Sequence, residues 1–167
     1  MDRRIPRPRL EARTSNERPH ALIVTDDPDL AEFLAEGLPL GGFWASVIAN
    51  GLQALEVFRL RQFDLVVVDG NMQSFEATEF LRRLRGISEL DRGAASRTTA
   101  PAVVIYTRSP GGTNPLAGST PELGIAATLV APLELDDIVR MLHQVFEDWR
   151  RDHPDTPLAD SANLRAF

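Results

Sequence analysis

The chain contains neither cysteine nor lysine, and all 18 residues counted as Lys or Arg are arginines. The lack of cysteine excludes disulfides, thiolate metal sites and cysteine nucleophiles. The lack of lysine removes the residue with which Gly-rich nucleotide loops bind phosphate, so residues 111–113 are weak evidence for such a loop. No apolar run approaches the length of a membrane span, and the charged N-terminus lacks the apolar core of a secretory signal. We therefore expect a cytoplasmic protein without membrane contact.

The composition is that of one globular domain with polar ends. The 167 residues, 43% of them hydrophobic and 25% charged, are enough for one substantial core. Residues 1–19 are rich in Arg and Pro and have no apolar period, so we expect a basic flexible arm there, a domain at 20–152 and a tail at 153–167. The net charge of −6 and the lack of a recognition helix argue against sequence-specific binding of nucleic acid.

Short apolar runs alternate with helical patterns along the central domain. The runs typical of buried strands are residues 21–24, 43–48, 65–68, 102–106 and 127–130. Helical patterns begin near residues 28, 51, 78 and 134. The prolines and glycines of residues 108–123 leave the remaining helix of the alternation, between the fourth and fifth strands, short or disrupted.

Residues with known positional preferences mark the starts of two helices. Asp27 and Pro28 suit the N-cap and the first position of the first helix, and Asn50 suits the N-cap of the second. The first helix is predicted to bury an apolar face made of Leu30, Phe33 and Leu34. The third helix is predicted to expose three arginines, Arg82, Arg83 and Arg85.

The alternation of strands and helices predicts an α/β fold. We expect a doubly wound, flavodoxin-like parallel sheet of five strands in the order 2-1-3-4-5, with helices on both faces. In this order the first and third strands are neighbours, so Asp26 or Asp27 should lie beside Asp69 where the strands end. Thr107 follows the fourth strand and should lie at the same edge, which is where open α/β sheets bind ligands.

Two carboxylates that converge at this edge repel each other unless a proton or a cation relieves the repulsion. Mg²⁺ suits such a pair because it prefers oxygen ligands and needs few protein carboxylates. Asp69 can also attack phosphorus as a covalent nucleophile, and the Thr107 hydroxyl can then hydrogen-bond a phosphoryl oxygen. The other interpretation is structural, because Asp, Gly and Asn at residues 69–71 are also the residue types of a tight turn.

Four motifs follow the predicted strands in the order of a known family: Asp26, Asp69-Gly70-Asn71-Met72, Thr107 and Pro132. Over residues 21–150 the chain resembles the receiver domain of two-component response regulators. The resemblance implies that Asp69 is the phosphoacceptor and Thr107 the switch hydroxyl. It also implies that Asp26, Asp69 and the backbone carbonyl of Asn71 bind Mg²⁺.

The chain departs from this family at the first metal position. Family members carry two adjacent acids after the first strand, and the Pro-Asp-Leu that follows here places Thr25 at the first acidic position and Asp26 at the second. In the alternative register Asp26 and Asp27 form the pair, which preserves both acids and displaces Pro28. With Thr25 in the pair, we expect weakened binding of Mg²⁺.

Two positions near the end of the fifth strand also differ from the family. Ala131 stands where the family has a lysine, and Thr128 where it has the aromatic residue that moves during signalling. Loss of the lysine removes a charge-assisted hydrogen bond to the acceptor or its phosphoryl group, typically worth about 1.5–3 kcal/mol. Arg108, next to Thr107, either supplies a substitute contact to phosphate or points to solvent.

The resemblance leaves three functions open. The first is an atypical receiver without an output domain, which acts through protein–protein interaction with weakened or absent phosphorylation switching. The second is a phosphorylatable single-domain receiver that accepts phosphate on Asp69 from a histidine kinase or phosphotransfer protein. The third is a Mg²⁺-dependent phosphohydrolase with Asp69 as nucleophile, against which Asn71 and the missing lysine argue. We expect a protein that is not an enzyme. Its expected partner is a histidine kinase, a phosphotransfer protein or a downstream target. The formation of a homodimer is left open.

Overall fold

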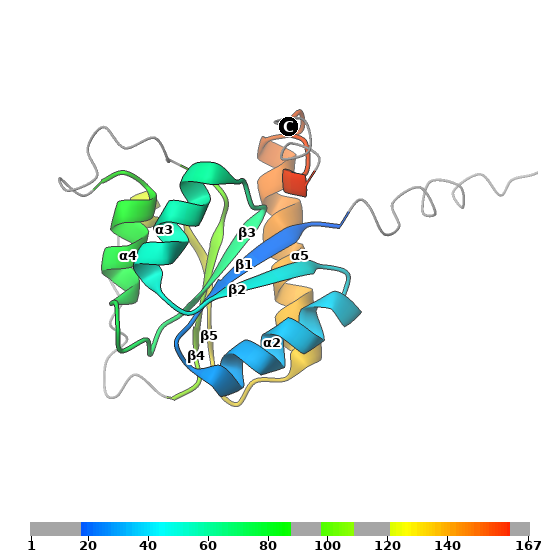
Figure 1. Ribbon diagram of the computed structural model, residues 1–167. Coiled ribbons are helices and arrows are strands. Elements are labelled where there is room, and N and C mark those ends of the chain that lie inside the picture. Colours follow the sequence, from blue (N-terminus) through cyan, green and yellow to red (C-terminus); the bar gives the residue numbers. More distant parts are fainter. Residues whose placement is uncertain (1–17, 88–97, 109–120, 161–167) are drawn as a thin grey trace, which may run out of the picture.

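The computed structural model describes residues 18–87, 98–108 and 121–160, and these form a single parallel sheet covered by helices (Figure 1). The strands are β1 His20–Val24, β2 Trp44–Ile48, β3 Leu65–Asp69, β4 Ala102–Tyr106 and β5 Ile125–Val130. The helices are α2 Pro28–Leu40, α3 Gly51–Leu60, α4 Ala77–Leu84 and α5 Leu135–Asp152, with a 3₁₀ turn, η3, at Pro121–Leu123.

The strand order β2-β1-β3-β4-β5 confirms the predicted order 2-1-3-4-5. All four neighbouring pairs are parallel. The N-caps are confirmed as well, since the Asp27 side chain accepts hydrogen bonds at the start of α2 and the Asn50 side chain does so at the start of α3. The predicted disruption of the helix between the fourth and fifth strands falls mostly on residues 109–120, and most of the basic arm on residues 1–17, both outside the described residues.

Helices cover both faces of the sheet, which explains why the central strands are continuous apolar runs rather than alternating ones. α3 and α4 pack on one face over alternate strand residues such as Val66 and Val68. α2 and α5 pack on the other over the intervening residues such as Leu65 and Val67. Every residue of β1, β3 and β4 is buried. The sheet therefore holds the ends of these three strands in fixed relative positions.

The buried stripe of α2 differs from the predicted one. Leu30, Leu34 and Leu38 are buried, whereas Phe33 is 39% exposed, so the prediction that Phe33 faces the core is wrong. The three leucines are spaced four residues apart. Gly37, three residues after Leu34, is also buried; it lies against the Leu135 side chain and has no room for a Cβ of its own.

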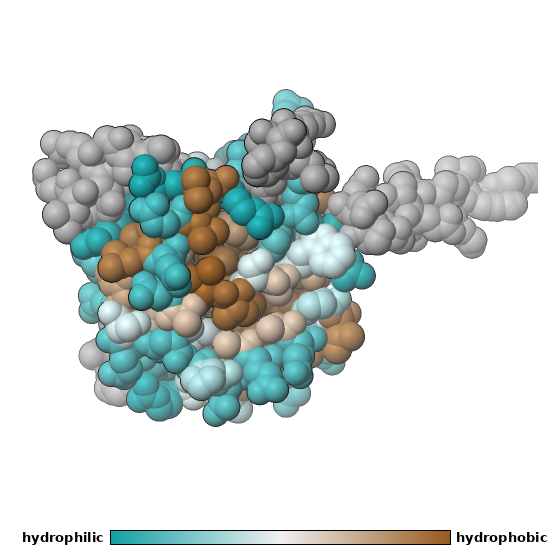
Figure 2. Space-filling view, in the orientation of Figure 1, coloured by the Kyte–Doolittle hydropathy of each residue, from teal (hydrophilic) through white to brown (hydrophobic). Residues whose placement is uncertain are grey.

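The surface over α3 is the most apolar part of the face in Figure 2, where a brown stripe runs along this region. Leu52 and Leu60 of α3 are 55% and 80% exposed, while Ala54 and Phe58 of the same helix are buried. No helix in the parts of the chain that the structure describes combines the length and hydropathy needed to cross a membrane.

Arg85 corrects a second expectation, because its side chain points inward rather than into solvent. Its guanidinium donates hydrogen bonds to the backbone carbonyls of Leu123 at 3.0 Å, Thr98 at 2.8 Å and Gly124 at 3.4 Å. Burial lowers the pKa of Arg85 to about 10. This arginine thus joins the C-terminal end of α4 to the segments that lead into β4 and β5.

Replacement of Arg85 by alanine should lower the free energy of unfolding by about 2–3 kcal/mol, because it removes the donor to the partly buried carbonyls of Leu123 and Thr98. Arg82→Ala on the same helix is the matched control, since Arg82 is exposed and its removal should change the free energy by no more than about 0.5 kcal/mol. Urea unfolding followed by circular dichroism measures both. Equal losses of free energy in the two variants would contradict the structural role that we assign to the Arg85 side chain.

Candidate functional site

The C-terminal ends of β1, β3 and β4 meet at one edge of the sheet, and each contributes a polar residue there. Thr25 follows β1, Asp69 is the last residue of β3 and Thr107 follows β4. The register aligns Asp69 with Ile105, two residues before Thr107. The predicted convergence of these three strand ends is therefore present in the structure.

Asp69 is only 2% exposed, and both oxygens of its carboxylate accept hydrogen bonds. The Thr25 hydroxyl donates to Oδ2 at 2.7 Å, and the backbone N–H of Asn71 donates to Oδ1 at 2.8 Å. Thr25 itself is 1% exposed, and its hydroxyl oxygen accepts the backbone N–H of Asp27 at 3.0 Å. These bonds meet the requirement that a buried carboxylate be hydrogen-bonded.

The two aspartates that follow Thr25 make different contacts. The Asp27 carboxylate accepts the backbone N–H groups of Asp29 and Leu30 and so caps α2. The Asp26 carboxylate reaches across the edge of the sheet and accepts the backbone N–H groups of Gln73 at 3.2 Å and Ser74 at 3.0 Å. This geometry agrees with the register in which Thr25 and Asp26 form the pair and Asp27 is a helix cap.

The charge of Asp26 is favoured by these contacts. Burial raises the pKa of Asp26, but the hydrogen bonds from Ser74 and Gln73 outweigh it, so that the pKa lies below its ordinary value of 3.8. Asp26 is therefore ionised at neutral pH. The bonds also tie the end of β1 to the loop between β3 and α4.

The side-chain oxygen of Asn71 collects three donors from the end of β4. The backbone N–H groups of Thr107 and Arg108 donate to Asn71 Oδ1 at 2.9 and 3.1 Å. The Thr107 hydroxyl lies 3.4 Å from the same oxygen. One amide oxygen thus accepts both main-chain N–H groups, and the Thr107 hydroxyl is directed to the same oxygen.

Gly70 and Tyr106 form a close contact that the sequence did not reveal. A Cβ atom built on Gly70 would lie 2.4 Å from Cε1 of Tyr106, so no residue larger than glycine fits. Tyr106 is 1% exposed, and burial raises the pKa of its hydroxyl. The signal that could have revealed this contact is the pairing of a glycine after Asp69 with a large aromatic residue at the end of the neighbouring strand.

Of the remaining predicted positions, Ala131 and Arg108 follow the ends of β5 and β4, whereas Thr128 lies within β5. The backbone N–H of Ala131, after β5, donates to the carbonyl of Tyr106 at 2.9 Å, and a cis peptide bond follows between Ala131 and Pro132. Thr128 in β5 is aligned with Val104 and is partly exposed. The Arg108 residue is exposed. No three His, Asp or Glu side chains gather into a metal-binding group anywhere in residues 18–87, 98–108 or 121–160.

Comparisons with known proteins agree with this geometry. A family model described as "Response regulator receiver domain" matches residues 21–143. The sporulation initiation phosphotransferase F of Bacillus subtilis (strain 168) is 29% identical over 117 residues, which cover 70% of this chain and 85% of that protein. The chain spans only about a third of the length of three other curated relatives that it matches.

Solved structures with the same fold include a sensor protein from Polaromonas sp. JS666, with a TM-score of 0.63 and 26% identity, covering 78% of this chain and 98% of that one. The receiver domain of a sensor histidine kinase from Pseudomonas aeruginosa PAO1 superposes with a TM-score of 0.61 at 18% identity, with the same coverage of both chains. That structure has a magnesium ion coordinated in its active-site cleft.

The lowered pKa of Asp26 predicts a dependence of stability on pH. A carboxylate whose pKa is lower in the folded chain stabilises the fold above its unfolded pKa, and this contribution is lost as the pH falls through the folded value. Asp26→Asn should therefore reduce the free energy of unfolding at pH 7, and the difference from wild type should shrink below pH 3.8. Urea unfolding at both pH values measures this. Glu36→Gln, an exposed site on α2, is the control, and a difference that does not shrink in acid would contradict the assignment.

Proposed function

The chain belongs to the response regulator receiver family, and from this premise we propose that it is an atypical receiver that acts through contact with a protein partner. In this proposal phosphorylation of Asp69 is weakened or absent as a switch. The observation that carries the proposal is the hydrogen bond from the Thr25 hydroxyl to Oδ2 of Asp69. Thr25 occupies the position of the first metal-binding acid, and its hydroxyl donates a hydrogen bond to Asp69, the carboxylate that phosphorylation would modify.

Transfer of a phosphoryl group to a carboxylate needs a free oxygen nucleophile and positive groups that offset the charge of the transferred group. Oδ1 and Oδ2 of Asp69 both accept hydrogen bonds, and the carboxylate is almost fully buried. The chain has no lysine to offset the charge. Arg108 is the nearest candidate along the chain for a substitute contact to phosphate, because its backbone N–H already lies at the site.

Mg²⁺ would be held by Asp26, Asp69 and the backbone carbonyl of Asn71, the oxygen donors that this ion prefers. The fit is partial. Thr25 supplies a neutral oxygen in place of a carboxylate, and the Asp26 carboxylate is engaged by the backbone N–H groups of Gln73 and Ser74. Bound metal would offset charge on a phosphoryl group. We therefore propose weakened binding of Mg²⁺, in which Asp26 supplies the second carboxylate beside that of Asp69.

The runner-up function is a phosphorylatable receiver that takes phosphate on Asp69 from a histidine kinase or a phosphotransfer protein. Two features favour it, namely the ionised Asp26 beside the site and the Thr107 hydroxyl at the end of the adjacent strand. Phosphorylation would then require the Asn71 side chain to release the N–H groups of Thr107 and Arg108. A hydrolase acting on phosphate monoesters is the least favoured function, and we propose that the chain is not an enzyme.

Replacement of Thr25 by aspartate should restore reactivity at Asp69. Wild type, Thr25→Asp, Thr25→Val and Asp69→Asn are incubated with Mg²⁺ and acetyl phosphate, and intact-mass spectrometry measures the phosphorylated fraction. We expect little adduct in wild type, a rise in Thr25→Asp accompanied by at least about tenfold tighter Mg²⁺ binding, and none in Asp69→Asn. Thr25→Val is the matched control, because it frees Oδ2 of Asp69 without adding an acid.

If wild type is phosphorylated as fast as Thr25→Asp, and Asp69→Asn is not phosphorylated, the proposal of an atypical receiver is wrong and the phosphorylatable receiver is favoured. Sustained release of phosphate from small monoesters by wild type would favour the hydrolase instead. Circular dichroism of each variant verifies that it is folded, since residue 25 is buried.

A further inference from the structure

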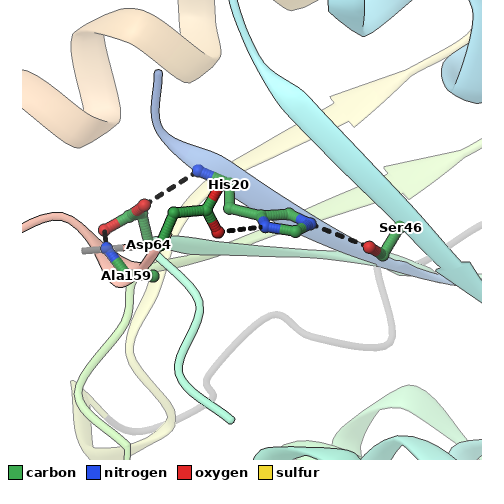
Figure 3. A network of polar contacts seen from close by, with 5 residues as sticks. His20, Ser46, Asp64 and Ala159 are labelled. Carbon is green, nitrogen blue, oxygen red and sulfur yellow. Dashed lines mark hydrogen bonds and ion pairs between the residues drawn. The ribbon is translucent and has the colours of Figure 1, made fainter. Parts of the chain in front are cut away.

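A second polar cluster lies at the opposite edge of the sheet, where the strands begin (Figure 3). Its members come from four separate parts of the chain, so no local pattern indicates it: His20, Ser46, Asp64 and Asp160. His20 opens β1 and is 8% exposed, and Asp64 directly precedes β3 and is 6% exposed. None of the four takes part in the site around Asp69.

The His20 imidazole is engaged on both sides. Its Nδ1 lies 2.8 Å from Oδ1 of Asp160, and its Nε2 lies 2.8 Å from the Ser46 hydroxyl. The Phe63 ring and the imidazole pack in a T-shaped arrangement, with the ring centroids 5.1 Å apart. The imidazole is thus fixed between the Asp160 carboxylate and a hydroxyl from β2, the second of which Figure 3 shows.

Asp64 binds main-chain donors from two segments. Its Oδ2 accepts the backbone N–H of His20 at 2.8 Å, and its Oδ1 accepts the backbone N–H of Ala159 at 3.0 Å. Burial raises the pKa of Asp64, which the two N–H donors partly offset. One buried carboxylate therefore joins the start of β1 to a segment that lies 95 residues further along.

The segment that meets these groups, residues 154–160, follows the C-terminal end of α5, and we call it the strap. The chain turns at His153, whose ring stacks on Trp149 at 4.1 Å and whose carbonyl accepts the N–H of Thr156 at 3.2 Å. Leu158 then packs against the core on the α2 and α5 side, and Ala159 is 2% exposed. Most other strap residues are exposed, so few contacts fasten it.

We propose that His20, Ser46 and Asp64 form a peptide-docking site that reads a small residue followed by an aspartate. In this chain its own strap fills the site. Asp64 accepts a hydrogen bond from the main-chain N–H of the small residue, and the His20 imidazole binds the carboxylate of the aspartate that follows. The buried position of Ala159 limits the size of the small residue. A partner segment with the same chemistry competes with the strap for the site. The proposal does not depend on the state of Asp69.

The chemistry of the site gives it this selectivity. A buried carboxylate such as Asp64 requires donors, and any peptide offers a main-chain N–H. The side chain at the next position is read by an imidazole held in one orientation by Ser46, so a carboxylate is preferred there to a neutral amide. A residue larger than alanine would have to displace the packing around Ala159.

The first test asks whether the Asp160 side chain holds the strap against His20 in the whole 167-residue chain. Amide hydrogen exchange of Ala159, followed by NMR, should become about tenfold faster or more in Asp160→Ala, because a charge-assisted contact is lost. Asp155→Ala is the matched control, since Asp155 is an exposed acid of the same segment, and its exchange should equal that of wild type. Unchanged exchange at Ala159 in Asp160→Ala would overturn the proposal.

The second test asks whether the site accepts a peptide from outside the chain. The probe is a fluorescent peptide with the sequence of residues 154–160, blocked at both ends, and fluorescence anisotropy measures its affinity for full-length protein. We expect it to bind Asp160→Ala at least about tenfold more tightly than wild type, in which the strap competes. A peptide whose final aspartate is replaced by asparagine should bind Asp160→Ala about tenfold more weakly.

Equal affinity of the two peptides for Asp160→Ala, or no binding of either, would overturn the docking site. Ser46→Ala combined with Asp160→Ala tests the receptor side, because Ser46 is only partly buried and its loss leaves the fold's core unchanged. Binding of the peptide should weaken in this double variant. If the double variant binds the peptide as tightly as Asp160→Ala alone, the part of the proposal that includes Ser46 in the docking site is wrong.

Discussion

The hydrogen bond between the Thr25 hydroxyl and the Asp69 carboxylate connects the neighbouring strands β1 and β3 at the edge where they end. A carboxylate that is 2% exposed persists as part of a folded chain only if its oxygens have donors, and here one is a side chain from β1 and the other is the N–H of Asn71. The same bond therefore satisfies a structural need, and our proposal for the reactivity of Asp69 rests on it. A second acid at position 25 would instead have required a cation between two charges.

The loop after β3 is also held by hydrogen bonds to the neighbouring strand ends. Its residues bind the Asp26 carboxylate through their N–H groups, while the Asn71 oxygen receives the N–H groups at the end of β4. Both contacts are made within the chain and need neither a metal nor an anion. These contacts link the ends of β1, β3 and β4 through the loop after β3.

The fold could be predicted because its determinants are local in the sequence. Buried strands are short apolar runs, and Asp27 and Asn50 cap the helices that directly follow them. Two features that the sequence did not indicate have long-range causes. Arg85 is held by carbonyls 13 to 39 residues away, and His20 pairs with Asp160 across 140 residues, so neither environment leaves a pattern in its own segment. At the candidate site the strand ends could be placed, whereas the hydrogen bonds that occupy Asp69 depend on side-chain orientations that spacing does not specify.

The contact between Gly70 and Tyr106 makes these two positions interdependent in the evolution of the chain. Any side chain at position 70 would enter the space that the Tyr106 ring fills. A change at either position alone therefore produces a clash or a cavity, whereas a larger residue at 70 together with a smaller one at 106 can conserve the total volume. Positions 70 and 106 should thus vary as a pair among close relatives of this chain.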